Sequence, residues 1–275
     1  MESEVSRVFN AAIFDMDGVV TQTARLHAAA WKEAFDDVLR RTAAEGAPVR
    51  PFDEDSDYRA YVDGKPRLDG VRSFLRSRDI SLPEGHEGDS PEAMTVHGLA
   101  QRKEGLFAAR LREQGVETFP STITLIEDLR AREIKIGLVT SSRHGREILE
   151  AAGIGRLFDA RLDGIDLQDR GLPGKPAPDM FVACAEALGT TPDRAAVVED
   201  ALAGVQAGRR GRFGLVVGVD RGASRTALAT AGADAVVSDL AEVDPERLDP
   251  RAAARLPRAW RSLSLKLAST GTVSG

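Results

Sequence analysis

Short, unbroken runs of apolar residues alternate with helical patterns over the second half of the chain. The runs, rich in β-branched residues, lie at 134–140, 195–200, 215–220 and 234–239, with a weaker one at 158–164. Helical patterns separate them, such as GREILEAAGI, which stops at Gly153, and PDMFVACAEALG, which stops at Gly189. Apolar strands without polar alternation, joined by helices, predict a parallel sheet that is covered on both faces.

Another apolar run, residues 11–14, ends in two acids, Asp15 and Asp17, followed by Gly18. A strand that ends this way puts carboxylates at the carboxyl edge of the sheet, where open α/β folds bind ligands. Alternate strand residues share a face, so both side chains can point into one crevice. Two carboxylates there suit a metal ion, or a nucleophile beside an acid–base group. The pair alone also fits a solvated acidic turn, so its interpretation depends on the other strand ends.

The pattern changes between the first strand and residue 134. Helical patterns at 24–42, 67–80 and 93–114 replace strands, and the polar, Pro- and Gly-bearing stretches 43–64 and 81–90 indicate loops. We therefore predict a Rossmann-like α/β core with an inserted α-helical cap domain. The expected bounds are 1–22 and 118–245 for the core, 23–117 for the cap and 246–275 for a frayed extension.

Composition narrows the class of protein. The 275 residues are 42% hydrophobic and 29% charged, with a net charge of −6. This balance argues against a general nucleic-acid binder, which needs a basic face, but not against a small anionic substrate. The one cysteine, Cys184, lies in a helical apolar pattern and is expected in the core. Neither a signal peptide nor a segment of membrane-spanning length is evident, which predicts a cytoplasmic protein without a membrane partner.

Polar groups follow four of the predicted strands or loops at the same sheet edge. They are Asp15 with Asp17, Thr140 with Ser141 and Ser142, Lys175 in GKPAPD, and Glu199 with Asp200. Each group has an ordinary structural explanation, such as helix capping or a solvated loop. Their joint occurrence at one edge is better explained by a binding site.

The combined chemistry of these groups is that of phosphoryl transfer, which needs cations around an anionic reactant. Asp15 supplies a nucleophilic carboxylate, and Asp17 gives and takes the proton of the transferred oxygen. Asp200, with Glu199, helps to hold Mg²⁺, which prefers oxygen ligands. Lys175 neutralises phosphate oxygens, and Thr140 forms hydrogen bonds to them.

The stretches FDMDGVV, LVTSS, GKPAPDMF and VVEDALAGVQAG resemble the four ordered motifs of the haloacid dehalogenase superfamily. Within it the chain resembles the β-phosphoglucomutase subgroup, whose helical cap follows the first motif. The resemblance implies Asp15 as nucleophile and Asp17 as general acid and base. It implies Mg²⁺ held by Asp15, the backbone carbonyl of Asp17, Glu199 and Asp200. It also implies a transferring phosphate bound by Thr140, Ser141 and Lys175.

The cap extends the resemblance. TQTARLHAAAW is similar to the hinge and first cap helix of the subgroup, where Thr23 and His27 match positions that couple cap closure to the acid–base group. Arg67 matches a cap arginine that holds the non-reacting phosphate, and Lys103 a cap lysine that contacts substrate. A histidine on a helix face is also commonly structural, and both cations also fit exposed helix charges. The chain departs from the subgroup at Gln22, at Ser121 and in extra cap segments at 43–61 and 85–96.

Three functions are compatible with these motifs. The first is a mutase that interconverts β-glucose 1-phosphate and glucose 6-phosphate through a bisphosphate. The second is a sugar-phosphate phosphatase, in which water attacks the aspartyl-phosphate. The third is a non-catalytic sensor, which the intact acidic and basic motif residues disfavour. We expect a small phosphorylated sugar as partner and a monomeric protein.

Overall fold

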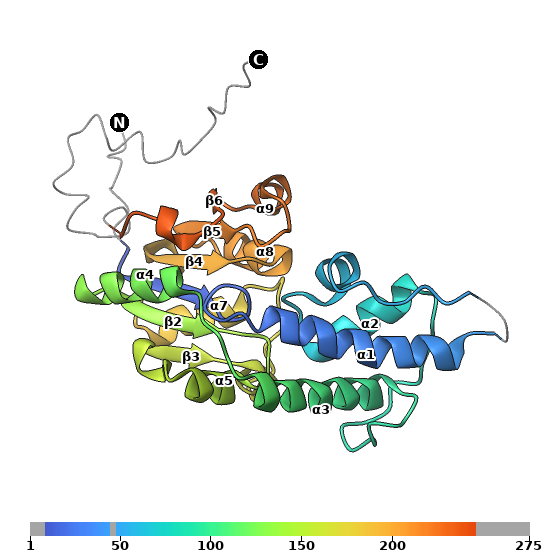
Figure 1. Ribbon diagram of the computed structural model, residues 1–275. Coiled ribbons are helices and arrows are strands. Elements are labelled where there is room, and N and C mark those ends of the chain that lie inside the picture. The colour runs from blue at the N-terminus through green and yellow to red at the C-terminus, as the bar shows by residue number, and fades with distance from the viewer. Residues whose placement is uncertain (1–8, 45–47, 246–275) are drawn as a thin grey trace, which may run out of the picture.

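A six-stranded parallel sheet with strand order β3-β2-β1-β4-β5-β6 forms the centre of the computed structural model, which describes residues 9–44 and 48–245 (Figure 1). The strands are β1 (Ala11–Asp15), β2 (Lys135–Val139), β3 (Ala160–Leu162), β4 (Ala195–Glu199), β5 (Leu215–Val219) and β6 (Ala235–Val237). The α/β prediction is confirmed, and every predicted strand is present. The weak pattern at 158–164 forms a strand of only three residues.

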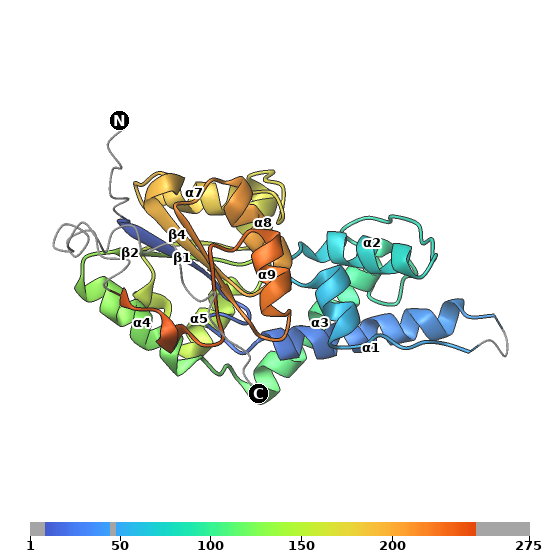
Figure 2. The ribbon, with the colours of Figure 1, turned by 90° about the horizontal axis from the view of Figure 1, so that it is seen from above.

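Helices cover both faces of the sheet (Figure 2). They are α4 (Pro120–Ala131), α5 (Gly145–Ala152), α6 (Gly164–Asp169), α7 (Asp179–Ala187), α8 (Leu202–Arg210) and α9 (Arg225–Ala231). Within β1, Ile13 packs in one buried cluster with Phe181 of α7, whereas Phe14 packs in the other with Ile126 of α4. Consecutive strand residues thus enter different cores, which explains the missing polar alternation.

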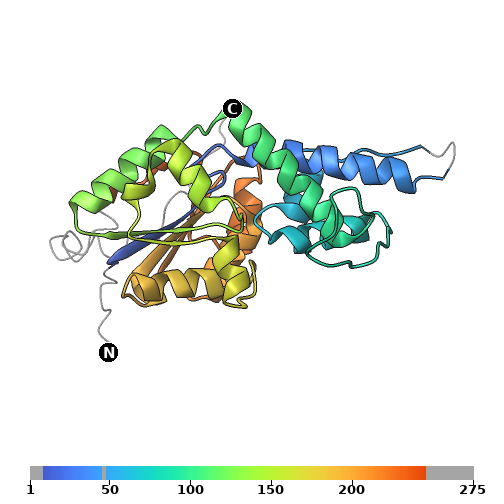
Figure 3. The ribbon, with the colours of Figure 1, turned by 90° about the horizontal axis from the view of Figure 1, so that it is seen from below.

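A third hydrophobic core lies beyond the carboxyl ends of the strands, in the inserted cap (Figures 1 and 3). It is formed by α1 (Ala24–Thr42), the π-helix η1 (Tyr58–Val62), α2 (Arg67–Ser77) and α3 (Val96–Gln114). Phe35 at its centre contacts Phe74, with ring centroids 4.0 Å apart. The cap therefore has its own apolar core and faces the sheet edge that carries the motifs. The bounds of the cap domain, 23–117, remain a prediction from the sequence.

Some predicted boundaries are wrong. The stretch 43–64 is not all loop, because it contains the π-helix η1. Its Val62 is buried in the cap core, and the buried Asp57 before it pairs with Arg78 at 2.5 Å. Helix α3 starts at Val96 rather than 93, because the hydroxyl of Thr95 accepts a hydrogen bond from the Gly98 amide at 2.9 Å. Tertiary packing and a cap hydrogen bond decide these limits, not periodicity.

Three other expectations concern the core and its surroundings. Cys184 is buried in the sheet core as predicted, and burial raises the pKa of its thiol to about 12. No helix within 9–44 and 48–245 combines the length and apolar character needed to cross a bilayer. The extension 246–275 lies outside the described residues.

Candidate active site

The strand register brings the first and fourth motifs together. Strand β1 lies between β2 and β4, with Asp15 opposite Val139 and Phe14 opposite Val198. Thr140 follows Val139 at the end of β2, and Glu199 follows Val198 in β4. The two residues therefore flank the end of β1. The predicted convergence at one sheet edge is what parallel pairing produces.

Lys175 joins two of the acids at this edge. Its Nζ donates hydrogen bonds to Oδ1 of Asp15 and, at 2.6 Å, to Oε1 of Glu199. The second oxygen of Glu199 accepts from the Ala201 amide at 2.8 Å. Burial by itself would lower the pKa of Lys175, but the charges of Asp15 and Glu199 raise it above its usual value. The lysine is thus a fixed cation beside the proposed nucleophile.

Three carboxylates bring together oxygen atoms that can coordinate a metal ion. Asp15, Glu199 and Asp200 are buried, and each offers an oxygen within 4.8 Å of the other two. Oδ1 of Asp200 is buried, and none of the residues that the structure describes donates a hydrogen bond to it. Burial, together with nearby acids, raises the pKa of Asp15 and of Asp200 well above the usual range. A set of oxygen donors with one unsatisfied atom fits a hard divalent cation.

Two glycines make room for these acids. Gly18 has φ +95°, and a Cβ there would lie 1.9 Å from Oδ2 of Asp200. A Cβ on Gly204, in helix α8, would lie 1.6 Å from Oε1 of Glu199. The glycines of the first and fourth motifs therefore allow the carboxylates to lie against the backbone.

Asp17 is held by residues of both the core and the cap. Its Oδ2 accepts from the hydroxyl of Thr140 at 2.8 Å, and its Oδ1 accepts from the hydroxyl of Thr23. Nε2 of His27 lies 3.3 Å from Oδ1. Burial would raise the pKa of Asp17, but His27 and the two hydroxyl donors outweigh it and lower the pKa well below its usual value. The group is therefore an anion in this arrangement, positioned by the start of the cap.

His27 is a link between Asp17 and Lys103. Nζ of Lys103 lies 2.9 Å from Nδ1 of His27, whose ring stacks on Phe107 with centroids 3.9 Å apart. An ammonium group only donates, so Nδ1 accepts and Nε2 carries the proton that faces Asp17. Burial, and then the charge of Lys103, lower the pKa of His27. Burial lowers the pKa of Lys103 itself to about 8.

Arg67 lies farther along the cap side of the site. Its Nη1 forms an ion pair with Oε2 of Glu104 at 2.7 Å, and Oε1 of Glu104 lies 2.5 Å from Nε2 of His144. The hydroxyl of Ser141, from the second motif, donates to the carbonyl of Gly64 in the cap at 2.9 Å. The structure thus places Thr23 and His27 against Asp17, and Lys103 against His27. Arg67 is linked through Glu104 to His144, which lies in the loop after β2.

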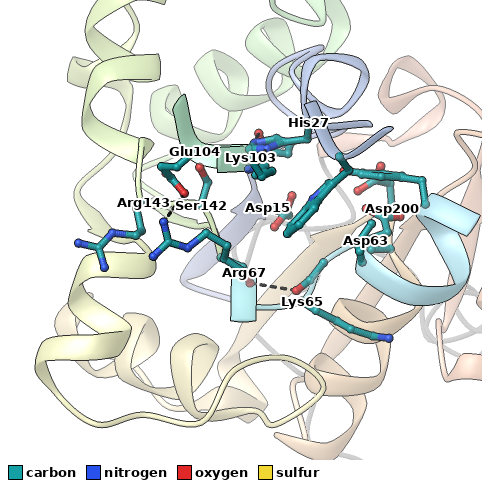
Figure 4. Close-up of a pocket in the computed structure, with 17 residues that line it drawn as sticks. Asp15, His27, Asp63, Lys65, Arg67, Lys103, Glu104, Ser142, Arg143 and Asp200 are labelled. Carbon is teal, nitrogen blue, oxygen red and sulfur yellow. Dashed lines mark hydrogen bonds and ion pairs between the residues drawn. The ribbon is translucent and has the colours of Figure 1, made fainter. Parts of the chain in front are cut away.

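A cavity of about 60 Å³ lies between core and cap (Figure 4). The core lines it with Asp15, Asp17 and Asp200, and the cap with His27, Arg67 and Lys103. Ligand pockets usually measure roughly 300–1,000 Å³. The cap contacts the core beside this cavity, as in the hydrogen bond from Ser141 to Gly64, and we call this arrangement closed. The space that it leaves is smaller than a usual ligand pocket.

Sequence reasoning missed several charged groups of this site, among them Asp63, Glu104 and His144, with Lys65 and Arg143 beside them. Asp63 lies in the segment predicted to be loop, Glu104 follows the predicted Lys103, and His144 follows the second motif. Asp63 and Glu104 line the closed cavity, and His144 contacts Glu104. His144 and its neighbour Arg143 had a usable signal, since they lie in the loop after a motif strand.

Comparisons with known proteins agree with this geometry. The family model of haloacid dehalogenase-like hydrolases matches residues 9–212. A β-phosphoglucomutase from Mycobacterium tuberculosis is 46% identical over 237 residues, which is 85% of this chain and 90% of the relative. A phosphorylated carbohydrates phosphatase from Thermotoga maritima is 28% identical over 230 residues, 82% of this chain and 93% of that protein.

A solved structure shows the same fold. A β-phosphoglucomutase from Clostridium difficile superimposes with a TM-score of 0.69 at 24% identity, covering 90% of this chain and 98% of the other. The chain therefore belongs to the haloacid dehalogenase superfamily and, within it, to the β-phosphoglucomutase-like enzymes.

Proposed function

We propose that the protein is a Mg²⁺-dependent β-phosphoglucomutase, which converts β-D-glucose 1-phosphate to glucose 6-phosphate. The mycobacterial relative of that name, 46% identical over most of both chains, supports this choice of substrate. The buried acids and Lys175 support phosphoryl transfer through Asp15. A phosphoryl group needs this combination of a carboxylate nucleophile and fixed cations.

The covalent step uses Asp15. Phosphorylated Asp15 first passes its phosphoryl group to a second hydroxyl of the sugar phosphate: the hydroxyl oxygen forms a bond to phosphorus while the bond from phosphorus to Asp15 breaks, giving a bisphosphate. Lys175, which donates a hydrogen bond to Asp15, stabilises the charge of the transferring group. The hydroxyls of Thr140 and Ser141 donate to Asp17 and to the Gly64 carbonyl here, so they would turn from these acceptors to bind the phosphate. In the return step, after the bisphosphate has reoriented, the Asp15 carboxylate oxygen forms a bond to the other phosphorus while the bond from that phosphorus to the sugar oxygen breaks. This restores the aspartyl-phosphate and releases glucose 6-phosphate.

Asp17 handles the proton in both directions. It protonates the sugar oxygen that leaves and takes the proton from the hydroxyl that attacks. Hydrogen bonds from Thr23 and Thr140 and the facing Nε2–H of His27 favour its anionic, proton-accepting form. A bound phosphate adds negative charge nearby, which raises the pKa of Asp17 and favours the acid form.

The acidic cluster fits Mg²⁺. Asp15, Glu199, Asp200 and the backbone carbonyl of Asp17 would hold the ion. Bound there, it would neutralise charge on the phosphate and shield the nucleophile from the neighbouring acids.

The contact between cap and core is the observation that favours the mutase over the phosphatase. Cap residues Thr23 and His27 contact the acid–base group, and only about 60 Å³ of space is left beside it. Cap contacts of this kind limit the access of bulk water to the aspartyl-phosphate, which favours a sugar hydroxyl as the acceptor. The phosphatase remains the second candidate, since the Thermotoga relative carries that name.

A product assay separates the two candidates. Wild-type protein is given β-D-glucose 1-phosphate and Mg²⁺, and glucose 6-phosphate is followed through a coupled dehydrogenase while free phosphate is measured in parallel. The mutase produces glucose 6-phosphate in large excess over free phosphate. Release of phosphate without isomerised sugar would establish the phosphatase instead.

The setting of the enzyme is part of the proposal. We propose a monomer in the cytoplasm that acts on a small phosphorylated sugar. The net charge of −6 supports the absence of a nucleic-acid partner. Sedimentation equilibrium of the full chain tests the monomer.

A further inference from the structure

Asp63 enters the closed cavity from a cap segment that is fastened to the core. It follows the π-helix η1 and precedes Gly64, whose carbonyl accepts the hydrogen bond from Ser141 at 2.9 Å. A Cβ on Gly64 would lie 2.9 Å from Cβ of Ala201, so the backbone here packs closely against the core. These contacts fix where the Asp63 side chain stands when the cap is closed.

The carboxylate of Asp63 faces the cavity without a partner among residues 9–44 and 48–245. It lines the cavity with Asp15 and Asp200 (Figure 4), yet among the described residues none donates a hydrogen bond to it or forms an ion pair with it. The other cap carboxylate of the cavity, Glu104, is already occupied by Arg67 and His144. Burial and the nearby charge of Glu199 raise the pKa of Asp63 to about 7. The half-buried side chain of Asp63 therefore presents a free acceptor at the cavity wall, where a donor on the ligand can reach it.

The chemistry of the site limits what that donor can be. The carboxylates close enough to share a metal ion are Asp15, Glu199 and Asp200, and Asp63 is not among them. A phosphate group has no proton to spare for a carboxylate and would be repelled by it, whereas Arg67 and Lys103 are cations that suit phosphate. The remaining donors on a sugar phosphate are its ring hydroxyls.

We propose that Asp63 accepts a hydrogen bond from a ring hydroxyl of the sugar held between core and cap. The enzyme thereby selects sugars that carry this hydroxyl. The inference rests on the proposed function, because it takes a sugar phosphate as the ligand. A site that hydrogen-bonds a substrate hydroxyl discriminates against analogues that lack this hydroxyl. A loss of roughly 10- to 1,000-fold in kcat/KM is expected for the matching deoxy sugar.

The test compares substrate preference rather than activity. Wild type and Asp63→Ala are assayed with β-D-glucose 1-phosphate and its 2-, 3- and 4-deoxy analogues, and kcat/KM is measured for each. Wild type should reject one analogue by about 10-fold or more, and Asp63→Ala should bring that ratio to within about 2-fold of unity. The near-isosteric Asp63→Asn, which keeps one acceptor oxygen, should give an intermediate ratio and replaces Asp63→Ala if the latter does not fold.

Controls separate this proposal from the proposed function. Asp69→Asn, an exposed acid of α2 that pairs with Arg72, should keep the wild-type ratios. A wild-type enzyme that turns over no glucose phosphate contradicts the proposed function. A wild type that is active on it, but whose preferences are the same in both Asp63 variants or that rejects none of the three analogues, overturns the role of Asp63 alone.

Discussion

The ammonium group of Lys103 lies 2.9 Å from Nδ1 of His27, although 76 residues separate them in the chain. The pair joins helices α3 and α1 of the cap and directs the Nε2–H of the imidazole toward Asp17. Asp17, the carboxylate that we propose transfers the proton, is therefore oriented by a cap contact, so its hydrogen bonding depends on the position of the cap.

Removing the positive charge of Lys103 should raise the pKa of His27. Burial lowers that pKa below 6.5, and the charge of Lys103 lowers it further, while Asp17 acts in the opposite direction. In Lys103→Met the burial of His27 and the charge of Asp17 remain, but the repulsion by the Lys103 ammonium group is gone. His27 should therefore be protonated at a higher pH than in wild type. The pKa is measured from the ring resonances of His27 by NMR.

The matched control for this measurement is Lys65→Met. Lys65 also lines the cavity, but its ammonium bonds to the Tyr61 carbonyl and the Ser73 hydroxyl, both at 3.0 Å. Its loss should leave the His27 titration where it is. A wild-type titration curve for His27 in Lys103→Met would contradict the assigned contact.

Asp15→Asn should abolish turnover while keeping the fold. The amide has nearly the size of the carboxylate but is no nucleophile, and loss of a nucleophile commonly costs roughly 10⁴-fold or more. Intact-mass spectrometry after acid quenching should find a phosphoryl group on wild type and none on the variant. Asp193→Asn, at an exposed position, is the control and should behave as wild type. Undiminished turnover by Asp15→Asn would refute the assignment of the nucleophile.

The core of the site could be predicted from sequence because the fold restricts its geometry strongly. Once 11–14 and 195–200 are parallel neighbours, Asp15 and Glu199 must meet at the same edge. The cap is different, since the His27–Lys103 contact depends on how two helices dock. The position of Asp63 depends on a π-helix inside a polar stretch, and hydrophobic periodicity carries no information about either.

A divalent cation should stabilise the folded protein. Asp15, Glu199 and Asp200 are buried close together, and Mg²⁺ bound by the folded state alone adds about 2.7 kcal/mol at a hundredfold excess over Kd. For a chain of this size that is an increase in Tm of roughly 5–10 °C. Thermal unfolding is measured with Mg²⁺ and with EDTA. In Asp200→Asn the increase should shrink or vanish, and an equal increase in both proteins would argue against the site.

Gly204→Ala should weaken the acidic cluster although alanine is the better helix former. A Cβ there would lie 1.6 Å from Oε1 and 2.0 Å from Cδ of Glu199, so this side chain must move and lose its bonds to Lys175 and the Ala201 amide. Overpacking of this kind costs about 1–3 kcal/mol. We expect a lower urea midpoint and, in calorimetric titration, an Mg²⁺ affinity reduced by about 10-fold, in the range seen for changes next to metal ligands.

Gly105→Ala supplies the matched control for that substitution. Gly105 is an exposed glycine of helix α3, and a Cβ there would meet no atom within 4 Å. The same chemical change should therefore stabilise the protein by up to about 1 kcal/mol through helix propensity alone and leave Mg²⁺ binding unchanged. Opposite shifts of the two urea midpoints would show that the space next to Glu199, rather than the helical glycine as such, is what the fourth motif requires. If both variants were stabilised and bound Mg²⁺ like wild type, the close packing of Gly204 on Glu199 would be refuted.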